Sequence, residues 1–317
     1  MRKLVFGLIL AVVLIGAAAA AVGLRTGSGE TNGKVELTVT RDFGAQPVGQ
    51  QHGAKAAPAD DTIMRLLESS YDVKTRYGGG FVQEIEGLAG GREDARPIDW
   101  FFYVNGIESP VGAAERKVAP GDRIWWDRHH WEAAQRIPAV VGSFPEPFLA
   151  GAEGRRIPTK VVCLGPVDRS CQEVETRLTA AGATGLGRST VMQGSGPGVL
   201  RVIVGRWSDV RTDPTAQALE RGPRASGVFA RFDPAGRQLE LLDQDGKVVR
   251  TVGAGAGLVA ATAQSDEQPT WLVTGTDEVG VAAAAAALEE DRLRDHFALA
   301  IENGTGTPLP TAERGQQ

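Results

Sequence analysis

The sequence predicts an α+β fold in which a β-grasp-like N-terminal domain is followed by an α/β or ferredoxin-like second domain, behind an N-terminal hydrophobic helix. Three observations predict it. Between residues 34 and 135, short stretches of alternating apolar and polar residues surround a single amphipathic helix pattern. Between residues 159 and 303, strand and helix patterns alternate, which is typical of βαβ units. Residues 4–24 form an uncharged apolar run ahead of both regions.

Residues 1–24 have the features of a targeting segment. A basic start, Met1-Arg2-Lys3, precedes the apolar run, whose length lies between that of a secretory signal and that of a membrane span. Its alanine-rich end suits a cleavage site near Ala18–Ala20. We therefore expect a signal peptide or a membrane anchor, followed by a linker at 25–33. Both alternatives give an extracytoplasmic protein, secreted or anchored at the cell membrane by this segment.

The length and charge of the chain limit the classes of protein it can belong to. The chain has 317 residues, which is enough for two ordinary domains once a leader is removed. The formal net charge of −5 gives no electrostatic reason to bind nucleic acid. The polar end of the chain, 304–317, has the composition of a disordered tail.

The first domain, 34–135, is expected to be one helix packed on a mixed sheet. Lys34–Thr40 alternates as a half-buried strand, and Asp60 or Asp61 can cap a helix through "DTIMRLLESS". Short strands follow in "DVKTRY", in "FVQEIEGLAGG" and on both sides of the Asn105-Gly106 turn. The segment "VAPGDRIWWDRHHW" closes the sheet after a Pro-Gly turn.

A proline-rich connection at 136–158 leads to the second domain, 159–303, because its four prolines exclude a helix interior or a central strand. The strands expected there are "TKVVCLG", "VLRVIVGRW", "GVFARF", two about Asp245-Gly246, "TWLVTGT" and "FALAI". The helices expected are "SCQEVETRLTAAG" capped by Ser170, "SDVRTDPTAQALERG", a turn and helix in "GAGAGLVAATAQ", and "DEVGVAAAAAALEEDRLRDH".

Residues 35–131 resemble the transcobalamin-like C-terminal domain family, also called domain of unknown function 4430. The resemblance rests on "DDTIMRLLE", "GGGFVQEIEGL", "DWFFYVNGIES" and "VAPGDRIWW", in that order. It implies a β-grasp-like fold and an exported small-molecule-binding protein that works beside a vitamin-type transporter. In transcobalamin and intrinsic factor the corresponding domain covers one face of cobalamin, so the resemblance makes a corrinoid a candidate ligand.

Aromatic side chains alternate with charges on two strands of the first domain. The pleat places Trp100 and Phe102 on one face and Tyr103 on the other, and it separates Trp126 from Trp125 in the same way. One face must fill the core, and the other can offer rings and charge to a flat ligand or pack against the second domain. The glycine turn at 78–80 can add polar contacts. The candidate ligand-binding residues are Trp100, Phe102, Tyr103, Trp125, Trp126, Arg128, Tyr77 and Gly79.

The cysteines, histidines and other reactive side chains do not form a recognisable metal site or catalytic motif in the sequence. Cys163 and Cys171 are expected to form a disulfide between a strand and the next helix, with two buried thiols as the alternative. His129 and His130 point to opposite faces of a strand, so no metal site is expected. No G-x-S-x-G elbow or paired-acid constellation is present, and His296 has no matched partner, so neither an enzyme nor a cofactor is predicted.

Together these features predict an exported, non-catalytic protein that binds a corrinoid or another vitamin-like small molecule as an accessory to an uptake system. Its expected partners are the small molecule, a membrane transporter and, if the leader is uncleaved, the membrane itself. The alternative is a non-catalytic structural or protein-interaction module at the cell surface.

Overall fold

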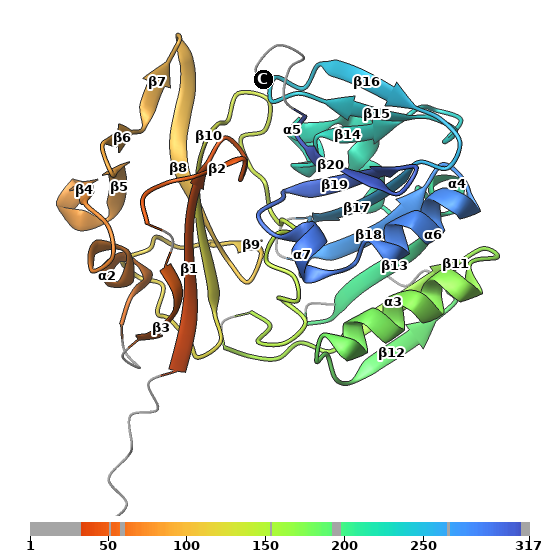
Figure 1. The fold of residues 1–317 in the computed structure, drawn as a ribbon, viewed down its shortest axis with the longest axis horizontal. Coiled ribbons are helices and arrows are strands. Elements are labelled where there is room, and N and C mark those ends of the chain that lie inside the picture. Colours follow the sequence, from red (N-terminus) through yellow and green to blue (C-terminus); the bar gives the residue numbers. More distant parts are fainter. Residues whose placement is uncertain are drawn as a thin grey trace, which may run out of the picture. The chain divides into compact units, whose positions relative to one another are not determined.

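The computed structural model describes residues 33–50, 52–57, 61–152, 154–191, 198–264 and 267–311 (Figure 1). The predicted leader at 1–24 and all but the last residue of the linker at 25–33 lie outside the described residues. Within the described part of the chain, no helix is both long enough and apolar enough to span a membrane. The mixed α+β class is confirmed, because sheets dominate and only a few helices accompany them.

The first domain is built on a mixed sheet with the strand order β2-β1-β10-β8-β7. Strand β1 (Gly33–Arg41) runs parallel to β10 (Arg123–His130), and β10 pairs antiparallel with β8 (Arg96–Val104). The remaining strands of this sheet are short: β2 (Gln46–Pro47), β3 (His52–Ala57) on β1, β7 (Gly91–Glu93) and β9 (Ile107–Glu108) on β8. The predicted Asn105-Gly106 turn joins β8 to β9, and both of its residues have positive φ.

One short helix, α2 (Ile63–Glu68), packs on this sheet, as predicted. It begins one residue later than an Asp61 cap would give, because the side chain of Thr62 accepts the Arg65 N–H. Beside α2, a small sheet of β4 (Val73–Arg76), β5 (Phe81–Ile85) and β6 (Leu88–Ala89) covers the same face, and the 3-10 turn η1 (Tyr77–Gly79) joins β4 to β5.

The second domain holds a seven-stranded sheet with the order β12-β11-β13-β18-β17-β19-β20 among the described residues. The first four strands are parallel and the last three are antiparallel. The strands are β11 (Thr159–Leu164), β12 (Leu186–Ser189), β13 (Leu200–Arg206), β17 (Gly257–Thr262), β18 (Thr270–Gly275), β19 (Ala298–Glu302) and β20 (Thr305–Leu309).

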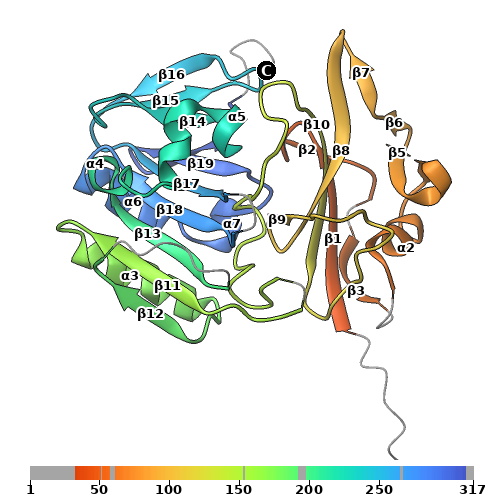
Figure 2. The same ribbon diagram turned by 180° about the vertical axis from the view of Figure 1, so that it is seen from behind.

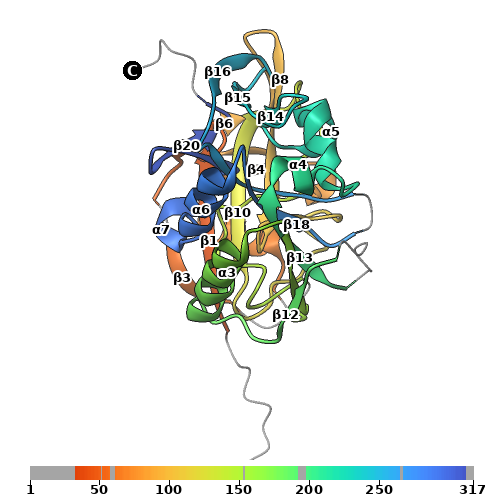
Figure 3. The ribbon, with the colours of Figure 1, turned by 90° about the vertical axis from the view of Figure 1, so that its right-hand side faces the viewer.

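Both faces of this second sheet are buried, and its side chains alternate between two apolar clusters. Helices α3 (Asp168–Ala180) and α6 (Glu278–Ala286) pack on one face (Figure 3). The other face meets a three-stranded sheet, β14-β15-β16, and three short helical turns. These elements are α4 (Trp207–Val210), η2 (Ala216–Arg221), α5 (Pro223–Ser226), β14 (Ala230–Phe232), β15 (Leu239–Leu242) and β16 (Val248–Val252); α7 (Glu290–Leu293) follows α6.

Several predicted elements of the second domain differ from the structure. The helix expected after Gly253 is wrong, because Gly257–Thr262 forms the central strand β17; an apolar run buried on both faces loses the alternation that marks a strand. The chain from Gly304 to Thr311 is not a disordered tail but continues into β20. Ser170 does not cap α3, which begins at Asp168 after Val167. The long helix expected at 277–296 is broken into α6 and α7.

The proline-rich connection is bonded to both domains and lies between them in Figures 1 and 2. Val140 N–H donates to the Gly106 carbonyl of the first domain at 2.9 Å. Val141 N–H donates to the Phe297 carbonyl of the second domain at 3.2 Å. Apolar side chains from Ile137 to Phe148 are buried along this segment. The connection therefore belongs to the interior, and residues 33–317 form one compact unit.

Cys163 and Cys171 are bonded, as predicted, and the bridge joins the end of β11 to the first turn of α3. Closing a loop this short is expected to contribute about 2.5 kcal/mol to the free energy of unfolding. Urea unfolding with and without a reductant should show this loss. In a Cys163→Ala/Cys171→Ala control the reductant should change nothing; an equal effect there would mean that the reductant acts elsewhere.

Gly44 tests how tightly the two domains approach each other. It has φ +84°, and a Cβ at this position would overlap the carbonyl oxygen of Asp295 in the second domain. Gly79 is the matched control, because it has φ +94° but open space around it. We expect Gly79→Ala to cost about 1 kcal/mol of backbone strain and Gly44→Ala to cost about 2 kcal/mol more in urea unfolding. Equal losses would contradict the close approach.

Candidate functional site

The sheet face beneath α2 is core. Trp100 and Trp126 are buried there, and the rings of Phe102 and Trp126 stack with centroids 4.7 Å apart. The Trp100 indole N–H donates to the Leu88 carbonyl at 2.9 Å. This face is thus covered by α2 and the small sheet, which bury Trp100 and Trp126 and leave Phe102 partly buried.

The opposite face, which carries Tyr103, Trp125 and His129, is covered by the second domain. Phe297, which directly precedes β19, reaches into it: its ring centroid lies 5.1 Å from that of Trp125 and 5.7 Å from that of Tyr103. His129 stacks between Phe43 and Phe101, with both centroid distances 4.5 Å. Of the two alternatives for this face, packing between domains is the one that the structure shows.

Asp127 lies at the centre of this covered face and is fully buried. Its carboxylate accepts hydrogen bonds from Thr40 Oγ1 at 2.6 Å, from the Gly44 N–H at 2.8 Å and from the Phe43 N–H at 3.1 Å. His129 Nδ1 lies 2.8 Å from the same carboxylate. These partners compensate the burial of a charged group and hold the turn after β1 against β10.

The other predicted ligand-binding residues lie in two places: Arg128 pairs in register with Trp100 on the face beneath α2, and Tyr77 and Gly79 lie in the η1 turn. Arg128 is buried, donates to the Ala89 carbonyl at 2.9 Å and pairs with Glu93 at 3.2 Å. Tyr77 is 86% exposed at the η1 turn, and Gly79 lies in the same turn with positive φ. The eight predicted residues are therefore spread over two buried faces and one exposed turn, and their role in ligand binding stays a prediction.

The two adjacent histidines diverge, as the pleat predicted. His129 points to Asp127, and His130 Nδ1 lies 3.2 Å from the Pro97 carbonyl. Among the described residues, no group of three or more His, Cys, Asp or Glu side chains could hold a metal ion.

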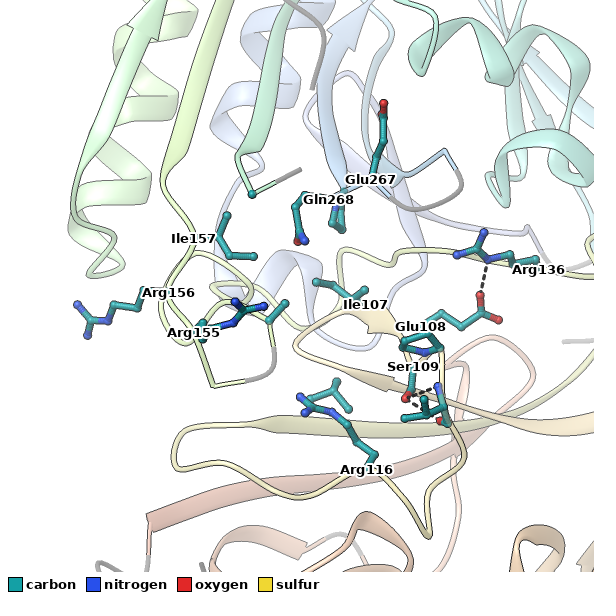
Figure 4. Close-up of a pocket in the computed structure, with 16 residues that line it drawn as sticks. Ile107, Glu108, Ser109, Arg116, Arg136, Arg155, Arg156, Ile157, Glu267 and Gln268 are labelled. Carbon is teal, nitrogen blue, oxygen red and sulfur yellow. Dashed lines mark hydrogen bonds and ion pairs between the residues drawn. The ribbon is translucent and has the colours of Figure 1, made fainter. Parts of the chain in front are cut away.

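A cavity of about 570 Å³ opens where the first domain, the connection and the second domain meet (Figure 4). Its volume falls in the range of small-molecule sites, which often lie between domains. It is lined by the end of β8, β9 and the loop after it, by the connection, and by two loops of the second domain. The lining residues are Val104, Ile107, Glu108, Ser109, Pro110, Val111, Arg116, Arg136, Ala152, Arg155, Arg156, Ile157, Gly198, Glu267, Gln268 and Pro269.

The polar side chains of the cavity differ in whether they form hydrogen bonds or ion pairs within the protein. The Arg136 Nε–H donates to the Glu108 carboxylate at 2.9 Å. Burial raises the pKa of Glu108, and the hydrogen bond and charge of Arg136 oppose that rise. Arg116 forms no ion pair with any described residue. In Figure 4, the side chain of Arg116 extends toward the cavity from the first domain and that of Arg155 from the connection, whereas Arg156 points away.

None of the cavity residues was predicted from the sequence. The available signal was weak: arginines occur in "AERK", "AQRIP" and "EGRRIP", each in a loop beside alanine, glycine or proline. Such arginines are ordinary solvent-exposed residues in most proteins. Only the folding of the connection against β9 brings them to one cavity.

The comparisons with known proteins agree with the predicted resemblance. Residues 60–130 match the family model "Domain of unknown function (DUF4430)", which confirms the resemblance. A solved structure of a candidate metal-binding protein from Ruminococcus gnavus shares 16% identity, covers 31% of this chain and 97% of its own, and has a TM-score of 0.25. Haptocorrin in complex with Cbi shares 13% identity, covers 32% of this chain and 26% of its own, and has a TM-score of 0.25. No curated protein matches the chain.

Asp127→Ala should test how much the buried network contributes to stability. The change leaves two backbone N–H groups without their acceptor inside the covered face, so we expect the free energy of unfolding to fall by about 3 kcal/mol or more. Asp99→Ala is the control, because Asp99 is half-buried and accepts from the Trp131 indole N–H at 3.2 Å. It should cost about 1 kcal/mol. Similar losses in urea unfolding would refute a special role for Asp127.

Proposed function

We propose that the protein binds a small molecule in the cavity between its two domains. The observation that carries the proposal is the cavity itself: about 570 Å³, walled by apolar side chains and bordered by convergent charged groups. Ile107, Ile157 and Pro269 supply apolar surface, while Glu108, Arg116 and Arg136 supply polar contacts that can orient a ligand. This combination of apolar area with a few placed polar groups is typical of binding sites for small molecules.

The proposed role is binding rather than catalysis. Among the described lining residues there is no histidine, cysteine or lysine. The Ser109 hydroxyl donates to the Val111 carbonyl at 2.8 Å, and Glu108 is engaged by Arg136. Neither of these contacts joins a nucleophile to a base. This favours a role for Ser109 and Glu108 in positioning a ligand.

The proposed setting is extracytoplasmic. The apolar run at 4–24 supports export, with the protein secreted or anchored at the membrane. The family resemblance supports a vitamin-like ligand such as a corrinoid and a role as an accessory to an uptake transporter. Since the aromatic sheet faces are covered, a corrinoid would have to use the cavity and its rim, with Tyr77 and Gly79 as the predicted residues that remain at the surface.

Two matched substitutions can test the cavity as the binding site. Val111 lines the cavity and Val248 lies on β16 outside it, and each is 43% exposed. Val111→Trp should fill part of the cavity and weaken ligand binding at least about tenfold, which corresponds to about 1.4 kcal/mol. Val248→Trp should leave the affinity unchanged. Isothermal titration calorimetry of the chain without its leader, against a panel of corrinoids and other vitamins, would measure both.

The panel also separates the proposal from its alternatives. A compound whose affinity falls with Val111→Trp and not with Val248→Trp supports the cavity. Equal binding by both variants would place the ligand elsewhere. If no compound on the panel binds, the proposed ligand class is refuted, and a surface interaction module becomes the better description.

A further inference from the structure

Arginines outnumber glutamates among the described residues that line the cavity. Four arginines and two glutamates line it, although the side chain of Arg156 points away from it (Figure 4). One of the glutamates, Glu108, is already paired with Arg136 at 2.9 Å. A half-enclosed space with excess guanidinium charge attracts anions, because its low-dielectric walls strengthen the field inside.

Arg116 is the guanidinium best placed to meet a ligand. Its charge acts on the carboxyl group of Asp122, where it opposes the rise in pKa that burial causes. That carboxylate is already occupied: it accepts from Asn105 Nδ2 at 2.9 Å and from the Ala119 N–H at 2.8 Å. Arg116 itself forms no ion pair within the described part of the chain and reaches into the cavity opposite Arg155 (Figure 4). Its donors are therefore available for a bound group.

The rest of the cavity is apolar. Ile107 lies between the Arg116–Arg155 end and the Arg136–Glu108 end, and Ile157 lies on the Arg155 side (Figure 4). Val104 and Pro269 add to the same wall. A ligand that fills the cavity would thus meet guanidinium groups at one end and hydrocarbon over much of its length.

We infer that the cavity takes an amphipathic anion: a small molecule whose carboxylate or phosphate is held by Arg116 and Arg155, with its apolar part against Ile107 and Ile157. The inference rests on the proposed function, which it narrows to a ligand class. A guanidinium binds such groups through paired N–H donors, which gives orientation as well as affinity. The paired carboxylate of Glu108 at the far end disfavours a second negative charge there.

A series of probes with one chain length tests the charge. Hexanoate and hexyl phosphate carry an anion, hexanol is neutral and hexylamine is a cation at neutral pH. Calorimetry should show that the two anions bind and that hexanol and hexylamine bind at least about tenfold more weakly, because each lacks a charge-assisted hydrogen bond. Added salt should weaken the binding of the anions more than that of hexanol.

Three variants locate the anion. Arg116→Gln should weaken the binding of hexyl phosphate at least about tenfold, and Arg116→Lys should recover part of the loss. Arg237→Gln removes the same charge from an exposed loop residue outside the cavity and should change the affinity less than about twofold. Glu108→Gln should strengthen binding, since it removes a negative charge and releases Arg136. Circular dichroism of each variant would confirm that it is folded.

The outcomes distinguish the inference from the proposed function. If hexanol binds as tightly as hexanoate, or if Arg116→Gln and Arg237→Gln behave alike, the anion inference is overturned. If Val111→Trp nevertheless weakens the binding of any probe, the cavity remains the binding site and only the ligand class is wrong. If no probe binds and Val111→Trp alters no titration, both are refuted.

Discussion

The insertion of Phe297 into the aromatic face of the first sheet is the contact on which the rest of the structure depends. That face carries Tyr103, Trp125 and His129 around a buried carboxylate, and water would solvate it poorly. Phe297 and the connection cover it from the other side. Phe297 comes from near the far end of the chain, so the packing of this face combines residues that are distant in the sequence.

The cavity is a consequence of that same contact. Once Phe297 is docked, the connection is fixed by hydrogen bonds from Val140 to the first domain and from Val141 to the second. The cavity beside β9 is lined by residues from the first domain, the connection and the second domain. The contacts that hold the two domains together would thus also fix the shape of the cavity in which the ligand binds.

Sequence patterns predicted the elements of the fold that are determined by residues close together in the sequence. The pleat of β10, the Asn105-Gly106 turn, α2 and the Cys163–Cys171 bridge all follow from local spacing. Patterns failed where burial on both sides erased alternation, as in β17. They could not indicate the cavity either, because Arg116 and Arg155 are distant in the sequence and line one cavity only through the path of the connection. The aromatic residues led to the prediction of a binding surface on sheet faces that are covered in the structure.

The parallel pairing of β1 with β10 shows that the first sheet needs residues outside the segment matched by the family model. The family model begins at residue 60, whereas β1 ends at Arg41 and supplies the whole neighbour of β10 on one side. A segment cut at the limits of sequence similarity would carry the recognisable motif yet present a bare strand edge, which invites pairing between chains. The family match at 60–130 is therefore about a quarter as long as the compact unit at 33–317 in which its strands are paired.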